Sequence, residues 1–189
     1  MESRSRVWPR WMAAPALAAA CCMALPAQPG GPDTHIPATH ATTLAGTEVV
    51  LPDALKDKVS VVVVGFSHAS QQQVASWGRL LAVDYGASHS VGYFELAMLA
   101  GAPRMMRGMI LKSMEKSVPY AERPHFLPVM EGEPAWRAVA RYNKPDDAYV
   151  LIVDGAGGVL WQTEGDATDA AWAELKKNLA GLTIPASAP

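Results

Sequence analysis

Apolar residues follow two different periodicities along the chain, and these predict strands and helices in turn. Val59 to Phe66 is a nearly unbroken β-branched run, as expected of a central strand buried on both faces. From Ser70 to Tyr85 the apolar residues recur every three or four positions, which is helical spacing. His89 to Leu99 returns to a strand pattern, so the first helix is expected to cross between two strands.

The segment after this second strand predicts an amphipathic helix rich in methionine. It begins at Pro103, which suits a first helical turn, and extends to about Ser117. Its methionines are Met105, Met106, Met109 and Met114. We interpret them as a core face, and the alternative is an Arg-edged surface that accepts apolar peptide. Val118 to Pro134 is then expected to be a proline-punctuated loop.

The C-terminal third predicts a β-hairpin and a final helix. Strands at Ala148–Val153 and Val159–Thr163 flank a glycine-rich turn. The final helix begins near Thr168 and ends at Gly181. A short edge strand at Thr47–Leu51 precedes the central strand, and a short helix precedes the hairpin. This mixture of strands and crossing helices indicates an α/β domain.

The N-terminal segment differs from the rest and predicts an export signal. Arginines precede an apolar run, Trp11 to Leu25, that falls short of the ~20 residues needed to span a bilayer. We expect a periplasmic or cell-envelope location, and import into mitochondria is the alternative, because acidic residues are nearly absent here. The predicted organisation is a signal peptide over 1–27, a flexible linker over 28–41, a domain over 42–182 and a disordered tail over 183–189.

The cysteines limit the chemistry that is open to this chain. Cys21 and Cys22 both lie inside the predicted signal, so cleavage after them leaves no thiol for redox chemistry or metal binding. Leu17 to Cys21 is similar to a lipoprotein cleavage box, and lipidation of Cys21 is the one membrane contact we consider. The remaining chain has an acidic excess, which argues against nucleic-acid binding. We expect no metal and no cofactor, because no ligand spacing or phosphate loop occurs.

The turn after the central strand carries the strongest competing chemistry. Gly65-Phe66-Ser67-His68-Ala69 nearly matches the G-x-S-x-G nucleophile elbow. A small serine hydrolase with Ser67 as nucleophile and His125 as base is therefore an alternative function. However, a single short strand precedes this turn, whereas the elbow of such hydrolases follows several. We therefore interpret Ser67 and Ser70 as N-capping residues and His68 as a turn residue.

The entry into the domain carries a first family resemblance. Leu44 to Phe66 reads as a G-x-x-V-x-L edge strand, a Lys-containing connector and the central strand, and it resembles thioredoxin-like proteins of the bacterial envelope and peroxiredoxins. The resemblance implies a thioredoxin-like three-layer α/β/α sandwich with a mixed sheet, here preceded by the signal peptide and the flexible linker. Those families place reactive cysteines at the start of the next helix, where this chain has Gln71 and Val74, and a cis-proline where it has Ala148. The resemblance therefore implies a redox site without its thiols.

Five short motifs carry a second, narrower resemblance. They are Val118-Pro119, Phe126-Leu127-Pro128, Val153-Asp154, Leu160-Trp161 and Gly165-Asp166-Ala167-Thr168. They resemble the assembly factor family of the mitochondrial ATP synthase membrane sector, which implies a protein partner such as a membrane-complex subunit. By residue type alone, Asp154 is expected to form a turn, and Asp166 and Thr168 are expected to cap the final helix.

These features predict an exported, thiol-free binding module rather than an enzyme. We expect an assembly or chaperone-type factor for an envelope or membrane complex; a hydrolase and a lipid-anchored scaffold are the alternatives. The expected binding surface is the place of the missing thiols and cis-proline, where unpaired backbone groups could add a strand of the partner. Its candidate residues are Ser67, His68, Gln71, Gln72, Trp77, Arg104, Arg107, Phe126 and Ala148. For Trp77, the alternative is a position in the hydrophobic core.

Overall fold

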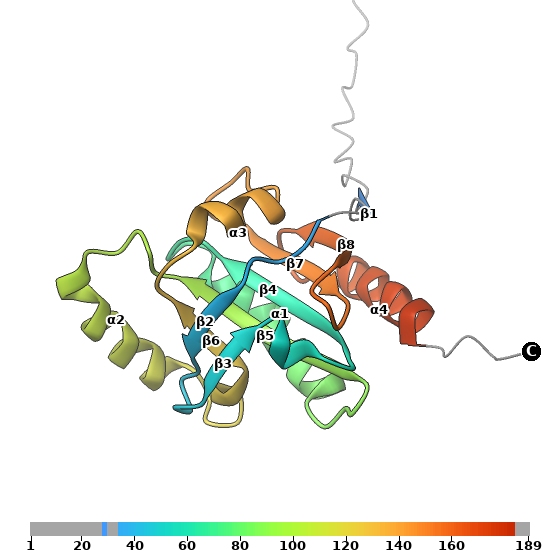
Figure 1. Ribbon diagram of the computed structural model, residues 1–189, viewed down its shortest axis with the longest axis horizontal. Coiled ribbons are helices and arrows are strands. Elements are labelled where there is room, and N and C mark those ends of the chain that lie inside the picture. The colour runs from blue at the N-terminus through green and yellow to red at the C-terminus, as the bar shows by residue number, and fades with distance from the viewer. Residues whose placement is uncertain (1–27, 30–33, 184–189) are drawn as a thin grey trace, which may run out of the picture.

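The central sheet has six strands in the order β1-β8-β7-β4-β5-β6 (Figure 1). This computed structural model describes residues 28–29 and 34–183. The strands are β1 (Gln28–Pro29), β4 (Val59–Gly65), β5 (Val91–Met98), β6 (Phe126–Val129), β7 (Ala148–Val153) and β8 (Val159–Glu164). β4, β5 and β6 are parallel, whereas β7, β8 and β1 pair antiparallel, so the sheet is mixed.

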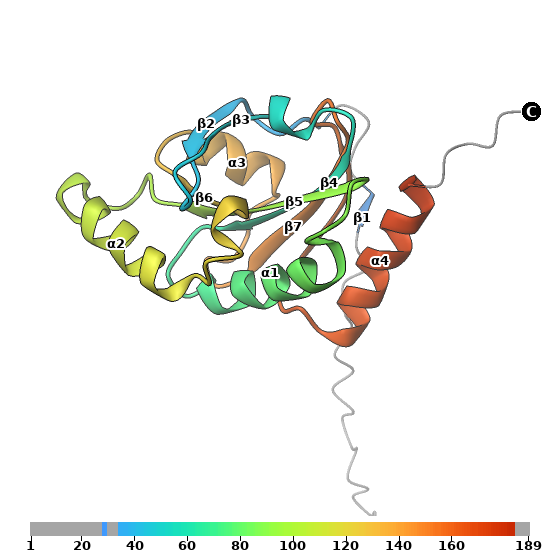
Figure 2. The same cartoon turned by 90° about the horizontal axis from the view of Figure 1, so that it is seen from below.

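Helices and a small second sheet cover the two faces of the central sheet. The helices are α1 (Gln71–Tyr85), α2 (Arg104–Ser117), α3 (Glu133–Val139) and α4 (Asp169–Thr183), with 3₁₀ turns at Asp53–Leu55 and Arg123–His125. The second sheet pairs β2 (Thr39–Thr42) with β3 (Glu48–Leu51), the predicted edge strand. Figure 2 shows α1 and α4 on one face, α3 with β2 and β3 on the other, and α2 beyond one end of the sheet.

The valines of β4 explain why this strand is central. Val61 and Val63 pack among residues of α1 and α4, whereas Val62 and Val64 pack on the face covered by α3 and β3. All four are fully buried, and burial of one such side chain contributes roughly 1.5–3 kcal/mol. Burial on both faces removes the need for alternating polar residues, so the central strand predicted from the β-branched run is confirmed.

The helical periodicity also placed the apolar faces of the covering helices correctly. α1 buries Val74, Trp77 and Leu81 against the sheet. α4 buries Trp172, Leu175 and Leu179 on the same face. Trp77 and Trp172 meet there with ring centroids 6.1 Å apart. α4 continues to Thr183, so Gly181 does not end the helix as expected.

The described part of the predicted linker belongs to the folded domain. Val159 N donates to Thr34 O (2.8 Å), and Ile36 is buried in the core. Trp136 Nε1 donates to Thr39 Oγ1 (2.9 Å), at the start of β2. Each of these residues contacts a distant segment of the chain. This part of the chain therefore has no helical or strand periodicity that would predict its burial from the sequence. The predicted signal (1–27), residues 30–33 and residues 184–189 of the predicted tail lie outside the described residues.

The predicted loop from Val118 to Pro134 contains a strand instead. β6 lies at the edge of the sheet and pairs in parallel with β5, and all four of its side chains are buried. Pro128 lies inside it, which an edge strand tolerates because one of its sides has no neighbouring strand. The prolines obscured this strand in the sequence.

The interpretation of the methionine stripe as a core face is wrong for most of its members. Met114 is buried, but Met105 is 91% exposed, Met109 is 63% exposed and Met106 is also exposed. α2 packs through Met114, with Ile110 and Leu111 partly buried beside it, in a small cluster apart from the two main cores. The physical reason is that α2 lies beyond the end of the sheet and covers neither face (Figure 2).

Candidate functional site

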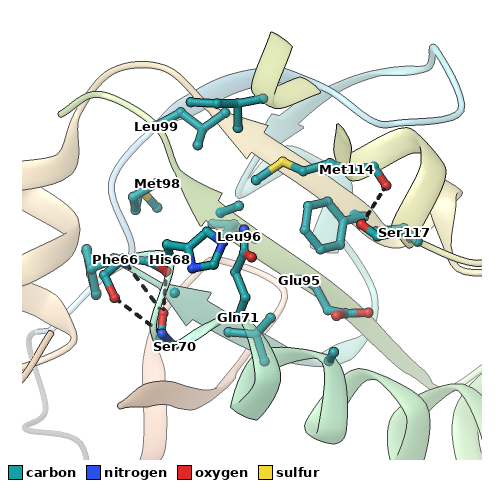
Figure 3. Close-up of a pocket in the computed structure, with 18 of the residues that line it drawn as sticks. Phe66, His68, Ser70, Gln71, Glu95, Leu96, Met98, Leu99, Met114 and Ser117 are labelled. Atoms are coloured by element: carbon teal, nitrogen blue, oxygen red, sulfur yellow. Dashed lines mark hydrogen bonds between the residues drawn. The ribbon is translucent and has the colours of Figure 1, made fainter. Parts of the chain in front are cut away.

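A cavity of about 610 Å³ opens where the carboxyl ends of β4 and β5 meet the start of α1 and the inner side of α2 (Figure 3). Its apolar wall consists of Phe66, Leu96, Met98, Leu99, Ile110, Met114, Val118 and Phe126. Five of the predicted binding residues also line it: Ser67, His68, Gln71, Gln72 and Phe126. The structure therefore brings most of the predicted turn together with residues of β5 and α2 in one pocket.

Ser67 holds the turn between β4 and α1. Its Oγ donates to the carbonyl of Pro145 (2.6 Å) and accepts from the amides of Ala69 (3.0 Å) and Ser70 (3.2 Å). Ser70 does not cap α1 through its side chain as expected; its hydroxyl donates to Ser67 O (3.0 Å) and closes the turn. The two hydroxyls therefore shape the turn by satisfying backbone groups, which is a structural role.

The serine hydrolase alternative is not supported by this geometry. A nucleophilic serine needs a base within about 2.6–3.2 Å, and Ser67 Oγ donates to a backbone carbonyl instead. His125 Nδ1 lies 3.1 Å from Tyr93 O, and its ring stacks on that of Tyr93 with centroids 4.1 Å apart. Burial lowers the pKa of His125. Among the described residues, no hydrogen bond joins the proposed nucleophile to the proposed base.

The backbone at the place of the missing cis-proline is already paired. Ala148 N donates to Gln73 Oε1 (2.7 Å), and Ala148 O accepts from Gly165 N (2.8 Å). This corrects the expectation that Ala148 leaves an open edge for strand addition. The sequence does not predict this bond of Gln73, because it forms only when α1 and β7 are side by side.

Three further predicted binding residues lie outside the cavity. Trp77 is fully buried and donates to Gly165 O (2.9 Å), so it is a core residue and not a surface anchor. Arg107 donates to Ala100 O (2.8 Å) and Ala102 O (3.0 Å) and thereby fixes the loop before α2. Arg104 is exposed at the start of α2.

Most of the family-motif residues have structural positions. Asp154 Oδ1 accepts from Ala156 N and Gly158 N in the hairpin turn, and Thr168 Oγ1 accepts from Ala171 N at the start of α4. Asp166 contributes its backbone carbonyl to Thr168 N rather than a side-chain cap. Gly165 has a φ of 95°, which favours glycine. Leu127, Pro128 and Trp161 are buried, and Pro119 lines the cavity.

The most unusual group in the cavity is Glu95, on β5. Glu95 is only 2% exposed, and its Oε1 has no hydrogen-bond partner among the described residues. A Cβ at Gly78 of α1 would clash with the Glu95 carboxyl group, so this glycine makes room for it. Burial and then the charge of Glu122 raise the pKa of Glu95 to about 8, whereas Arg79 acts in the opposite direction. In the sequence, Glu95 is an acidic residue inside an apolar strand, a pattern that does not by itself predict a binding role.

The other charged groups of the cavity are a bound pair and a single acid. Glu133 Oε1 lies 2.6 Å from Arg137 Nη2, and the Arg137 guanidinium stacks over the ring of Tyr142 at 4.0 Å. Glu122 lines the cavity near Glu95. Among residues 28–29 and 34–183, no three His, Cys, Asp or Glu side chains come close enough to hold a metal ion. The same part of the chain has no helix that is both long and apolar enough to cross a bilayer.

A family model described as ATP10 protein matches residues 33–182. No curated protein matches the chain by sequence. This match covers residues 34–182 of the described chain, including residues 34–41 of the predicted linker.

Several solved structures share the fold at low sequence identity. A putative thiol:disulfide interchange protein DsbE from Chlorobium tepidum is 15% identical with a TM-score of 0.54, over 82% of this chain and 96% of that one. The exposed lipoprotein thioredoxin Etrx1 from Streptococcus pneumoniae is 12% identical with a TM-score of 0.55, over 75% and 99%. BsSco, of the Sco family of cytochrome c oxidase assembly proteins, is 12% identical with a TM-score of 0.51, over 80% and 97%. The thioredoxin-like α/β fold expected from the sequence is confirmed.

Proposed function

The chain belongs to the ATP10 protein family, and on this premise we propose that it is a redox-inactive assembly factor that holds an apolar segment of a membrane-complex subunit in the cavity between α1 and α2. The family match bears out the resemblance of the second half to an ATP synthase assembly factor. The proposed client is therefore a subunit of a membrane complex such as the membrane sector of ATP synthase.

The observation that carries this proposal is the apolar cavity at the start of α1. Thioredoxin-like enzymes keep their thiols at this helix start, but this chain has no cysteine beyond Cys22. The cavity is instead lined by Leu99, Ile110 and Met114, and its mouth carries the polar side chains of Gln71 and Gln72. Such an apolar pocket with a few polar groups suits binding better than thiol exchange.

The exposed methionines of α2 support the same conclusion. Met105, Met106 and Met109 lie on the helix that forms one wall of the cavity, and Arg104 is exposed beside them. Methionine side chains are flexible and polarizable, so they adapt to apolar surfaces of varied shape. We propose that these residues form the outer margin of the client-binding surface, which is the alternative that the sequence left open for the methionine stripe.

The proposed location follows from the N-terminal sequence. An export signal over residues 1–27 would deliver the domain to the cell envelope, and the alternative transit peptide would deliver it to mitochondria. Either compartment contains membrane complexes that need assembly. Lipidation of Cys21 would add a tether to the membrane without changing the role of the domain.

Site-specific photo-crosslinking tests the proposal. A benzoylphenylalanine at His68, an exposed residue that lines the cavity, is compared with one at Val83, which is 82% exposed and does not line it. In membranes of the source cells, we expect position 68 to crosslink to apolar segments of one membrane-complex subunit. Equal crosslinking from both positions, or crosslinks from position 68 to soluble proteins only, would contradict the proposal.

A further inference from the structure

Glu95 places an unsatisfied acceptor at the floor of the cavity. Its Oε1 is buried and unpaired among the described residues, and Figure 3 shows the side chain extending from β5 among the lining residues. Leaving a buried polar group without a partner is costly, so such a group in a pocket calls for a donor from outside. Gly78 supports this view, because a side chain at that position would displace the carboxyl group.

The charges around Glu95 leave this end of the cavity acidic. Glu133 is neutralised by Arg137, at 2.6 Å, and does not contribute a free charge. Glu122 faces Glu95 from the loop after α2, and Tyr93 lies two residues away on the same strand. The nearby cation is Arg79, on the exposed side of α1, where its Nη2 donates to Ser76 Oγ (3.0 Å). The field at the cavity floor therefore favours a positive ligand.

We propose that the cavity selects a polypeptide segment in which one lysine or arginine is flanked by apolar residues, with the basic side chain donating to Glu95. This specificity rests on the proposed function of the cavity. The aliphatic stem of a basic residue suits the apolar walls formed by Met114 and Phe126, while its charged end satisfies the buried oxygen. A neutral donor would satisfy Oε1 as well, but it would not balance the charge of Glu122 or the charge that Glu95 carries once it is ionised.

Binding of a cation is linked to the proton on Glu95. Burial and Glu122 hold the pKa of Glu95 at about 8, so at pH 7 this carboxyl group is mostly protonated. A cationic side chain therefore binds together with release of a proton. As the pH is raised toward 8, the affinity for the cationic peptide should increase about tenfold for each pH unit. Above about pH 8 the affinity should become independent of pH.

Fluorescence anisotropy with matched peptides tests this inference. The probes are labelled heptapeptides of leucine and alanine whose central residue is lysine or, as the isosteric apolar control, norleucine. At pH 8 we expect the full chain to bind the lysine peptide at least tenfold more tightly. Glu95→Gln should remove this difference, whereas Glu131→Gln, which removes an exposed carboxylate, should preserve it.

A second measurement avoids dependence on the variant. Calorimetry of the wild-type chain at pH 7, in two buffers of different ionisation enthalpy, should show proton release with the lysine peptide and none with norleucine. Equal binding of both peptides without proton release would overturn the selection of a cation but leave an apolar binding cavity. Failure of both peptides to bind would overturn the inference together with the proposed function.

Discussion

Replacing Glu95 with glutamine should change how the stability of the protein depends on pH. The pKa of Glu95 is raised from 4.5 to about 8 by burial and by Glu122. In the unfolded chain this carboxyl group ionises near pH 4.5, while in the folded chain it keeps its proton until about pH 8. Stability that is fully present below pH 4.5 is therefore lost progressively as the pH rises to about 8. Glutamine is similar in shape and cannot ionise, so this loss should disappear.

The expected magnitude is large enough to measure. One pKa unit corresponds to about 1.36 kcal/mol, so the full rise corresponds to roughly 5 kcal/mol in the free energy of unfolding. Between pH 5 and pH 7 the wild-type protein should lose about 2 to 3 kcal/mol relative to Glu95→Gln. Domains of this size have total stabilities of roughly 5–15 kcal/mol, so such a change would be conspicuous.

Urea denaturation followed by circular dichroism at several pH values provides the assay. Taking the difference between wild type and variant cancels the titration of all the other groups. Glu131→Gln serves as the control, because it removes an exposed carboxylate of the same type. If the difference between wild type and Glu95→Gln stays constant from pH 5 to pH 7, Glu95 is not the buried, proton-holding group described above.

Three further predictions concern the turn and its chemistry. In an insulin-reduction assay the protein should match buffer, because no cysteine follows Cys22, and catalytic turnover by the chain without residues 1–27 would contradict this. Ser67→Ala should lower the free energy of unfolding by about 0.5–2 kcal/mol in urea denaturation, because the Ser67 hydroxyl bonds to three backbone groups. Labelling of Ser67 by a fluorophosphonate would instead support the hydrolase hypothesis. Gln73→Ala should lower the free energy of unfolding by about 1–3 kcal/mol in the same measurement, because Ala148 N loses its acceptor. The control Gln72→Ala, at an exposed position, should leave this free energy nearly unchanged. Equal losses in the two variants would refute the role of Gln73.

The sequence by itself determined the main elements of the fold and the position of both cysteines near the N-terminus. The valine run of β4, the apolar faces of α1 and α4 and the β7–β8 hairpin were all predictable, because periodicity records which side of an element is buried. The lack of cysteine beyond Cys22 is likewise a property of composition. Each of these conclusions depends on residues that are close together in the chain.

Only the tertiary structure decided what the site consists of. Gln73 and Ala148 are 75 residues apart in sequence, and Trp136 and Thr39 are 97 apart, so no local pattern could pair them. The methionines of α2 look like a core face until the helix is placed beyond the sheet. Glu95 became a candidate binding group because folding buries it against Gly78 beside a cavity, and burial, unlike residue type, depends on contacts that the whole chain makes.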